Sequence, residues 1–206
     1  MTVPTTDLLS VRDAARHRRS IRTYRDESIP REDLEEILAE VSLAPSAFNA
    51  QPWRFVVVES AEVREQLAAA AYNQRQVRSA PAVIVLYTDM AETLRTVDEI
   101  LHPGMDDAKR DSARSAFLRI FGQQSEADRE AWGAAQGHIA LGYLLLAAAA
   151  HGYETSPMAG FDAERVKTLL NLPANARVPA IVAIGHGAEA GFSHHRHPVH
   201  RIASFV

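Results

Sequence analysis

The chain has 206 residues, of which 47% are apolar and 23% charged, a balance that is ordinary for a globular protein with one hydrophobic core. A formal charge of −4 is too small to favour nucleic acid or an anionic membrane as a partner. The absence of cysteine excludes disulfides, cysteine-ligated zinc, iron–sulfur clusters and thiol catalysis. The first ten residues have neither the basic start nor the apolar run of a signal peptide, so we expect a cytoplasmic protein.

The first half of the chain predicts three helices and two strands. An opening helix over roughly 7–17 precedes an arginine-rich turn, and Pro30 is expected at the first position of a second helix. This helix has one apolar face and ends near Pro45, because a residue before proline avoids helical backbone angles. A buried strand over 55–58, a helix from the cap Ser60 to about 72, and a strand over 82–87 follow.

The second half predicts longer helices between short strands. Residues of about 90–124 form a polar helical excursion with a break at 102–104, which we expect to be mobile or to face a substrate. A helix from Ser125 to about 151 contains an apolar run that is shorter than the ~20 residues a membrane span needs, which favours a core or a subunit interface. A strand over 153–156, a helix capped by Asp162 and a strand over 178–185 complete an α+β layered domain covering 1–206. Apolar side chains in the C-terminal arm, 192–206, predict that the arm is held in place.

Two segments carry unusual chemistry. Arg18, Arg19, Ser20 and Arg22 form either a solvated basic turn at a helix end or a phosphate site, in which guanidinium forks and a hydroxyl bind the anion. The loop over 45–53 could be a simple helix stop, but that interpretation leaves Ser46, Asn49 and Gln51 without partners. Amide side chains suit the alternating polar edge of an isoalloxazine ring, and the residues alone do not decide between the two interpretations.

Histidines in the arm raise the question of a metal site. His194, His195, His197 and His200 could converge, but no carboxylate follows Gly191 and no HExxH helix is present, so we predict no metal. A cationic arm that closes over an anion is the favoured interpretation. Neither a glycine-rich phosphate loop nor a GxSxG elbow occurs.

Taken together and in order, the segments 18–22, 45–53, 157–162 and 194–198 resemble the nitroreductase family of flavin mononucleotide (FMN) enzymes, over about 15–201. The resemblance implies an α+β fold with a central mixed or antiparallel sheet flanked by helices, in an intertwined homodimer with one FMN at each of two interface sites. It also implies a set of cofactor-binding residues. The phosphate, ribityl chain and pyrimidine would be bound by Arg18, Arg19, Ser20, Arg22, His194 and Arg196. The ring would be lined by Pro45, Ser46, Asn49 and Gln51 of the partner, by Asn73 and Gln76 at the pyrimidine edge, and by Pro157, Met158 and the backbone of Ala159 and Gly160 near N5.

The implied activity is the reduction of quinones, nitroaromatics or similar acceptors by NAD(P)H in a ping-pong mechanism, without a catalytic side chain. Two departures bear on it: many family members have lysine at the position of His194, and the well-known nitroreductases often have glutamate at that of Ala159. Four alternatives stay open. They are a reductive dehalogenase, a flavin or azoline oxidase, a flavin-sequestering protein with little turnover, and a metal-dependent hydrolase that uses the arm histidines.

Overall fold

The computed structural model describes residues 8–206, and within them four strands form one antiparallel sheet in the order β1-β2-β4-β3. The strands are β1 (Trp53–Val58), β2 (Ala82–Thr88), β3 (Glu154–Met158) and β4 (Arg177–Gly185). Register places Val56 opposite Val85, and Val85 opposite Ile181. A single parallel bridge joins Ser20 to Thr155 at the β3 edge. The predicted α+β class is confirmed, and the sheet is antiparallel rather than mixed.

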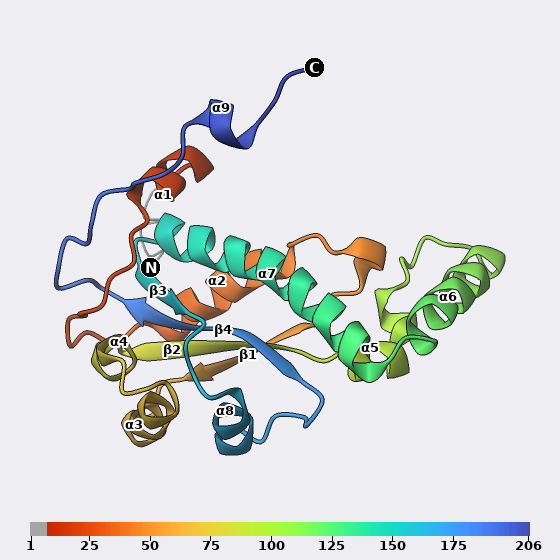
Figure 1. Ribbon diagram of the computed structural model, residues 1–206, viewed down its shortest axis with the longest axis horizontal. Coiled ribbons are helices and arrows are strands. Elements are labelled where there is room, and N and C mark those ends of the chain that lie inside the picture. The colour runs from red at the N-terminus through yellow and green to blue at the C-terminus, as the bar shows by residue number, and fades with distance from the viewer. Residues whose placement is uncertain (1–7) are drawn as a thin grey trace, which may run out of the picture.

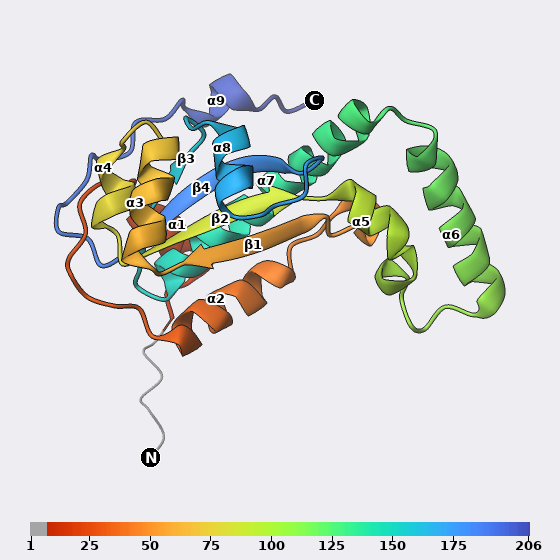
Figure 2. The ribbon, with the colours of Figure 1, turned by 90° about the horizontal axis from the view of Figure 1, so that it is seen from below.

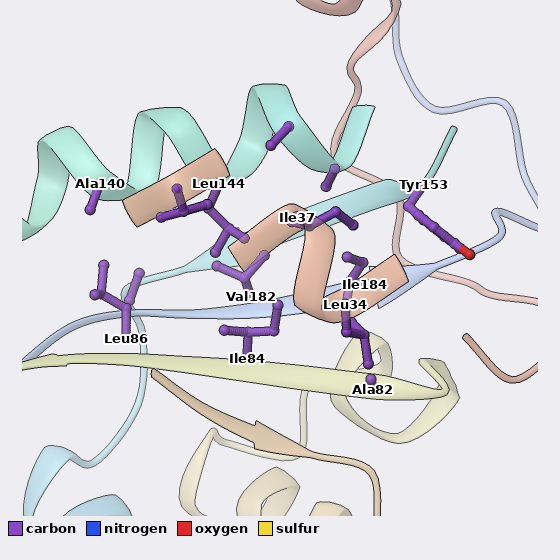
Figure 3. Packing of buried hydrophobic residues seen from close by; sticks show 14 of the residues in the cluster. Leu34, Ile37, Ala82, Ile84, Leu86, Ala140, Leu144, Tyr153, Val182 and Ile184 are labelled. Atoms are coloured by element: carbon purple, nitrogen blue, oxygen red, sulfur yellow. The ribbon is translucent and has the colours of Figure 1, made fainter. Parts of the chain in front are cut away.

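Helices cover both faces of the sheet (Figures 1 and 2). Above it in Figure 1 lie α1 (Val11–His17), α2 (Arg31–Ser42) and α7 (Glu126–Ala150); below it lie α3 (Ala61–Ala70), α4 (Arg75–Ser79) and α8 (Ala163–Leu169). Successive side chains of β2 point to opposite faces of the sheet, so the core has two layers. Ile84 and Leu86 pack with α2 and α7, whereas Val83 and Val85 pack with α3, α4 and α8. Figure 3 shows the first of these layers, in which Leu34, Ile37 and Leu144 meet side chains of β2 and β4.

Most predicted helix starts are confirmed by their caps. Side-chain oxygens of Ser60, Ser125 and Asp162 accept hydrogen bonds from the backbone N–H three residues later. Pro30 was expected inside the second helix, but its ψ of 140° is extended and the helix begins at Arg31. The start expected near residue 7 lies outside the described residues, and α1 follows Ser10. The short helix α4 was not predicted.

The long helix α7 lies directly against the sheet. At Gly137 an added Cβ would lie 2.8 Å from Cγ2 of Thr88, so only glycine allows this close approach. Among residues 8–206, α7 alone has the length and composition of a membrane span, and its buried face accounts for part of that apolar character. Ile139 and Tyr143 on its other side remain 39% and 41% exposed.

Two segments extend from this layered body. At one end of the sheet, α5 (Met90–Arg95), the 3₁₀ turn η2 (Val97–Ile100) and α6 (Asp107–Gly122) project outward, with the predicted break between η2 and α6 (Figure 2). At the other end, the arm runs along the body to α9 (Val199–Ile202). Phe192, Ile202 and Phe205 are 89%, 71% and 91% exposed, so within a single chain these apolar side chains are not what holds the arm.

Candidate functional site

An anion-sized cavity lies where the segment after α1 meets the arm. Its volume is about 160 Å³, and its lining is Arg18, Arg19, Ser20, Arg22, Phe192, Ser193, His194 and Arg196. The segment is positioned by the sheet edge, because the backbone N–H of Ile21 donates to the carbonyl of Thr155 at 3.1 Å. The arginine-rich turn and the C-terminal arm, which are 170 residues apart in the sequence, therefore meet in this cavity. We call this space the cation cavity.

Positive charge in the cation cavity is not compensated by the residues that line it. Burial lowers the pKa of the Arg18 guanidinium, and the charges of Arg196 and Arg19 lower it further. No carboxylate occurs among the described side chains of the lining. Arg18, Arg19 and Arg196 therefore repel one another, and a bound anion would relieve this repulsion. Guanidinium forks can bind phosphate oxygens in pairs, so the donor set fits a phosphate group.

Arg19 also has a structural role, which agrees with the interpretation of this segment as a basic turn at a helix end. Its Nη1 donates to the carbonyls of Arg16, His17 and Arg18 at 2.6, 2.9 and 2.9 Å, which satisfies the end of α1. His194 Nε2 lies 2.8 Å from the Arg18 carbonyl oxygen and 3.0 Å from the same Arg19 nitrogen. The arm is thereby fixed to the end of α1. Within residues 8–206, no cluster of three or more histidine and acidic side chains is arranged to hold a metal ion.

A second cavity of about 370 Å³ adjoins the first and shares Ser20, Arg22 and Phe192 with it. Sequence reasoning missed two residues that line it, Arg75 and Glu189. The Glu189 carboxylate accepts from the backbone N–H of Arg22 at 2.7 Å and lies 3.5 Å from an Arg75 nitrogen. The bond from Arg22 lowers the pKa of Glu189, and Arg75 lowers it further. The one feature of the sequence that could have indicated Glu189 is its place as a single acidic residue just before a strongly basic arm.

Residues predicted at the pyrimidine edge and near N5 gather around α4 and the end of β3. The Gln74 amide donates to the Gly160 carbonyl at 2.7 Å, and the buried Gln76 donates to Gln74 at 3.0 Å. Asn73, with φ of 58°, accepts from Arg78 at 2.8 Å. Two further predicted residues also belong to the fold: Met158 is buried in the core, and Pro157 pairs with Val182 in the sheet. Ala159 and Gly160 are exposed just beyond them.

The loop of residues 45–51 lies at the opposite end of the sheet (Figure 1). It precedes Trp53, which pairs with Thr88, whereas the cation cavity adjoins Thr155, which pairs with Ile184. The intervening seven residues of β2 span roughly 20 Å at the rise of an extended strand. Within one chain, the structure therefore does not bring this loop to the cation cavity.

Polar side chains of the loop are all engaged, so the argument that a simple turn would leave them without partners is wrong. Ser46 Oγ accepts from the Gln51 N–H at 3.0 Å, and the Gln51 amide donates to the Asn49 carbonyl at 3.1 Å. Asn49 itself donates to the carbonyl of Ile100 at 3.0 Å. The loop is also strained, because Phe48, Asn49 and Gln51 have φ of 59°, 56° and 41°, and left-handed backbone costs ~1–3 kcal/mol at each non-glycine residue.

Comparison with known proteins decides the family. The model of the nitroreductase family matches residues 15–186. The chain belongs to this family. It is 44% identical to an NADH dehydrogenase of Thermus thermophilus, over 96% of this chain and 97% of the relative. It is 36% identical to YdgI of Bacillus subtilis, named as an NAD(P)H nitroreductase, over 91% of this chain and 93% of the relative.

Solved structures agree with the sequence relatives. A protein of Exiguobacterium sibiricum, described as a nitroreductase and solved in complex with FMN, superimposes with a TM-score of 0.87 at 29% identity. The alignment covers 98% of this chain and all of that one. The resemblance predicted from four short segments is thus confirmed for the family and for its fold.

Proposed function

We propose that this member of the nitroreductase family is an FMN-dependent oxidoreductase that takes electrons from NAD(P)H and passes them to quinones, nitroaromatics or similar acceptors in a ping-pong cycle. The cation cavity carries the proposal, since Arg18, Arg19 and Arg196 offer a phosphate group charge that no lining carboxylate neutralises. The relatives named for NADH and NAD(P)H, and the neighbour solved with FMN, support the same conclusion.

In this proposal the chain's own residues bind, orient and tune the cofactor. Arg18 and Arg196 would hold the phosphate, and the Ser20 hydroxyl would supply a further donor. Gln74 fixes the peptide of Gly160, so that the exposed end of β3 presents backbone groups in a set orientation. Arg22 adds positive charge beside the second cavity, where it would stabilise negative charge that develops during reduction, whereas the charge of Arg75 is paired with Glu189. Bound FMN supplies the hydride chemistry at its ring, and no side chain is needed as acid or base.

The proposal includes a homodimer in which the loop of residues 45–51 completes the partner's site. One chain leaves this loop roughly 20 Å from the cation cavity. Apolar surface is available for the contact: an open groove of about 460 Å³ lies between α1, α2 and α7, lined mainly by leucine, valine, alanine and tyrosine side chains. The exposed apolar residues of the arm, including Ile202 and Phe205, would find cover on the partner.

The deciding experiment is the absorption spectrum of the purified, desalted protein, repeated without oxygen after NADPH and then NADH. A yellow protein whose visible flavin band bleaches supports the proposal, and the faster donor identifies the preferred nucleotide. A yellow protein that neither donor bleaches contradicts the reductase and favours a flavin-sequestering protein or a specialised flavin oxidase. A colourless protein that takes up no added FMN contradicts the cofactor assignment, and activity lost to a chelator would then favour a metal-dependent hydrolase.

A further inference from the structure

The strained loop of residues 45–51 is held by aromatic packing against α6. Phe48 is 55% exposed, yet the edge of its ring meets Phe117 and Phe121, with centroids 6.1 and 5.7 Å apart and planes at 78° and 89°. Both partners are almost completely buried, at 2% and 1% exposure. Phe121 in turn packs on Trp132 of α7 at 4.5 Å. One continuous aromatic stack therefore connects the loop to the base of the projecting segment.

Two polar contacts attach the same loop to two further elements. The Asn49 amide donates to the Ile100 carbonyl of η2, and the Ala47 N–H donates to the Gln136 side chain of α7, each at 3.0 Å. Left-handed backbone at Phe48 is uncommon for a bulky residue and persists only where the surroundings determine it. Here those surroundings are η2, α6 and α7, all outside the loop.

We propose that the segment of residues 90–122 is a brace: it holds the loop of residues 45–51 in its left-handed conformation and thereby sets the flavin-ring side of the partner's site. Phe117 and Phe121 are then positioning residues, which act on the ring from within α6 without touching it. This inference rests on the proposed function, since it requires a flavin beside the loop. It assigns to the excursion a role different from the mobile or substrate-facing one expected from its sequence.

The test compares Phe117→Ala with Leu118→Ala, its neighbour on α6, which is 39% exposed and has no part in the aromatic stack. Flavin fluorescence titrations measure Kd for FMN and for riboflavin, which lacks the phosphate. For Phe117→Ala we expect both Kd values to rise by the same factor, about 2- to 12-fold for the lost aromatic pair with Phe48, the pair that reaches the loop. Leu118→Ala should change neither by more than about twofold. Phe117→Leu, which keeps apolar contact, should recover part of the loss.

Readouts beyond affinity separate positioning from general instability. The visible circular dichroism of bound flavin should change in Phe117→Ala and stay unchanged in Leu118→Ala. If Phe117→Ala does not fold, Phe117→Leu carries the test, because it keeps apolar contact but loses the aromatic pair with Phe48, and a smaller parallel rise in both Kd values is expected. Equal flavin affinities in the wild type and the brace variants would overturn the proposal, as would a loss confined to FMN.

Mixed dimers test whether the brace acts on the partner. One chain carries Phe117→Ala, the other carries Arg18→Ala and Arg196→Ala, and differently tagged copies are purified as the heterodimer. If the loop serves the partner's site, one site combines both defects and the other is intact, so one FMN per dimer binds with wild-type affinity. If the loop serves its own chain, no site is intact and the proposal is overturned. A wild-type protein that binds no flavin is a different result, which refutes the proposed function itself.

Discussion

Substitution of Arg196 should have opposite effects on cofactor binding and on the apoprotein. Arg196 lines the cation cavity, and its charge contributes to the lowered pKa of Arg18. Removing it takes away a charge-assisted bond to phosphate worth ~1.5–3 kcal/mol, so Arg196→Ala should bind FMN about 10- to 150-fold more weakly. The apoprotein loses a repulsion instead, and because these side chains are partly exposed its free energy of unfolding should rise by at most ~1 kcal/mol.

Flavin fluorescence titration and urea denaturation of the apoprotein measure the two effects. Riboflavin affinity should stay within about twofold of the wild type, because riboflavin has no phosphate for Arg196 to bind. Arg201→Ala is the matched control, since Arg201 belongs to the same arm but does not line the cavity. An equal loss of FMN and riboflavin affinity would refute the phosphate assignment, and a less stable apoprotein would refute the repulsion argument.

Three further predictions concern stability. Leu144→Ala removes a fully buried side chain between α7 and the sheet and should lower the free energy of unfolding by ~2–5 kcal/mol in urea titrations. A loss below ~1 kcal/mol would mean that neighbouring side chains move in to fill the cavity. Gly137→Ala forces a methyl group against Thr88 and should cost ~1–3 kcal/mol in the same assay. Since the pKa of Glu189 is lowered on folding, its stabilising effect is present above its ordinary pKa of 4.5 and is lost as pH falls below that value. Glu189→Gln should therefore lose less stability than the wild type on acidification from about pH 5 to pH 3, and equal losses would contradict the contact with Arg22.

Local chemistry made most of the fold predictable. Serine and aspartate caps mark where helices begin, and apolar runs after a turn mark the strands, so Ser60, Ser125 and the run over 82–87 were assigned correctly. By contrast, α4 has only five residues and no apolar periodicity, which left it without a signal. Strand order depends on pairings between distant segments, and the sequence alone did not determine it.

The site was predictable only as a set of segments. Arginine density and the histidine-rich arm indicated an anion, and these residues do share one cavity. The contacts that organise these residues could not be predicted, because Glu189 and Phe48 each contact residues more than 60 positions away in the sequence. The partner of Asn49 was missed for the same reason as the left-handed backbone, because both follow from how the loop meets η2, α6 and α7, whereas Ser46 was missed because the left-handed turn brings the Gln51 N–H back to it.

The cation cavity also has a consequence for biosynthesis. His194 contacts the carbonyl of Arg18 across 176 residues, so the second half of the cavity is synthesised long after the first. Strand β4 ends only at Gly185, so the central pairings of the sheet form shortly before residues 192–196 emerge, and the phosphate grip is completed after them. Cofactor loading at this cavity therefore waits for synthesis of the arm, and cells that make this protein faster than they make flavin should accumulate a colourless form that matures later.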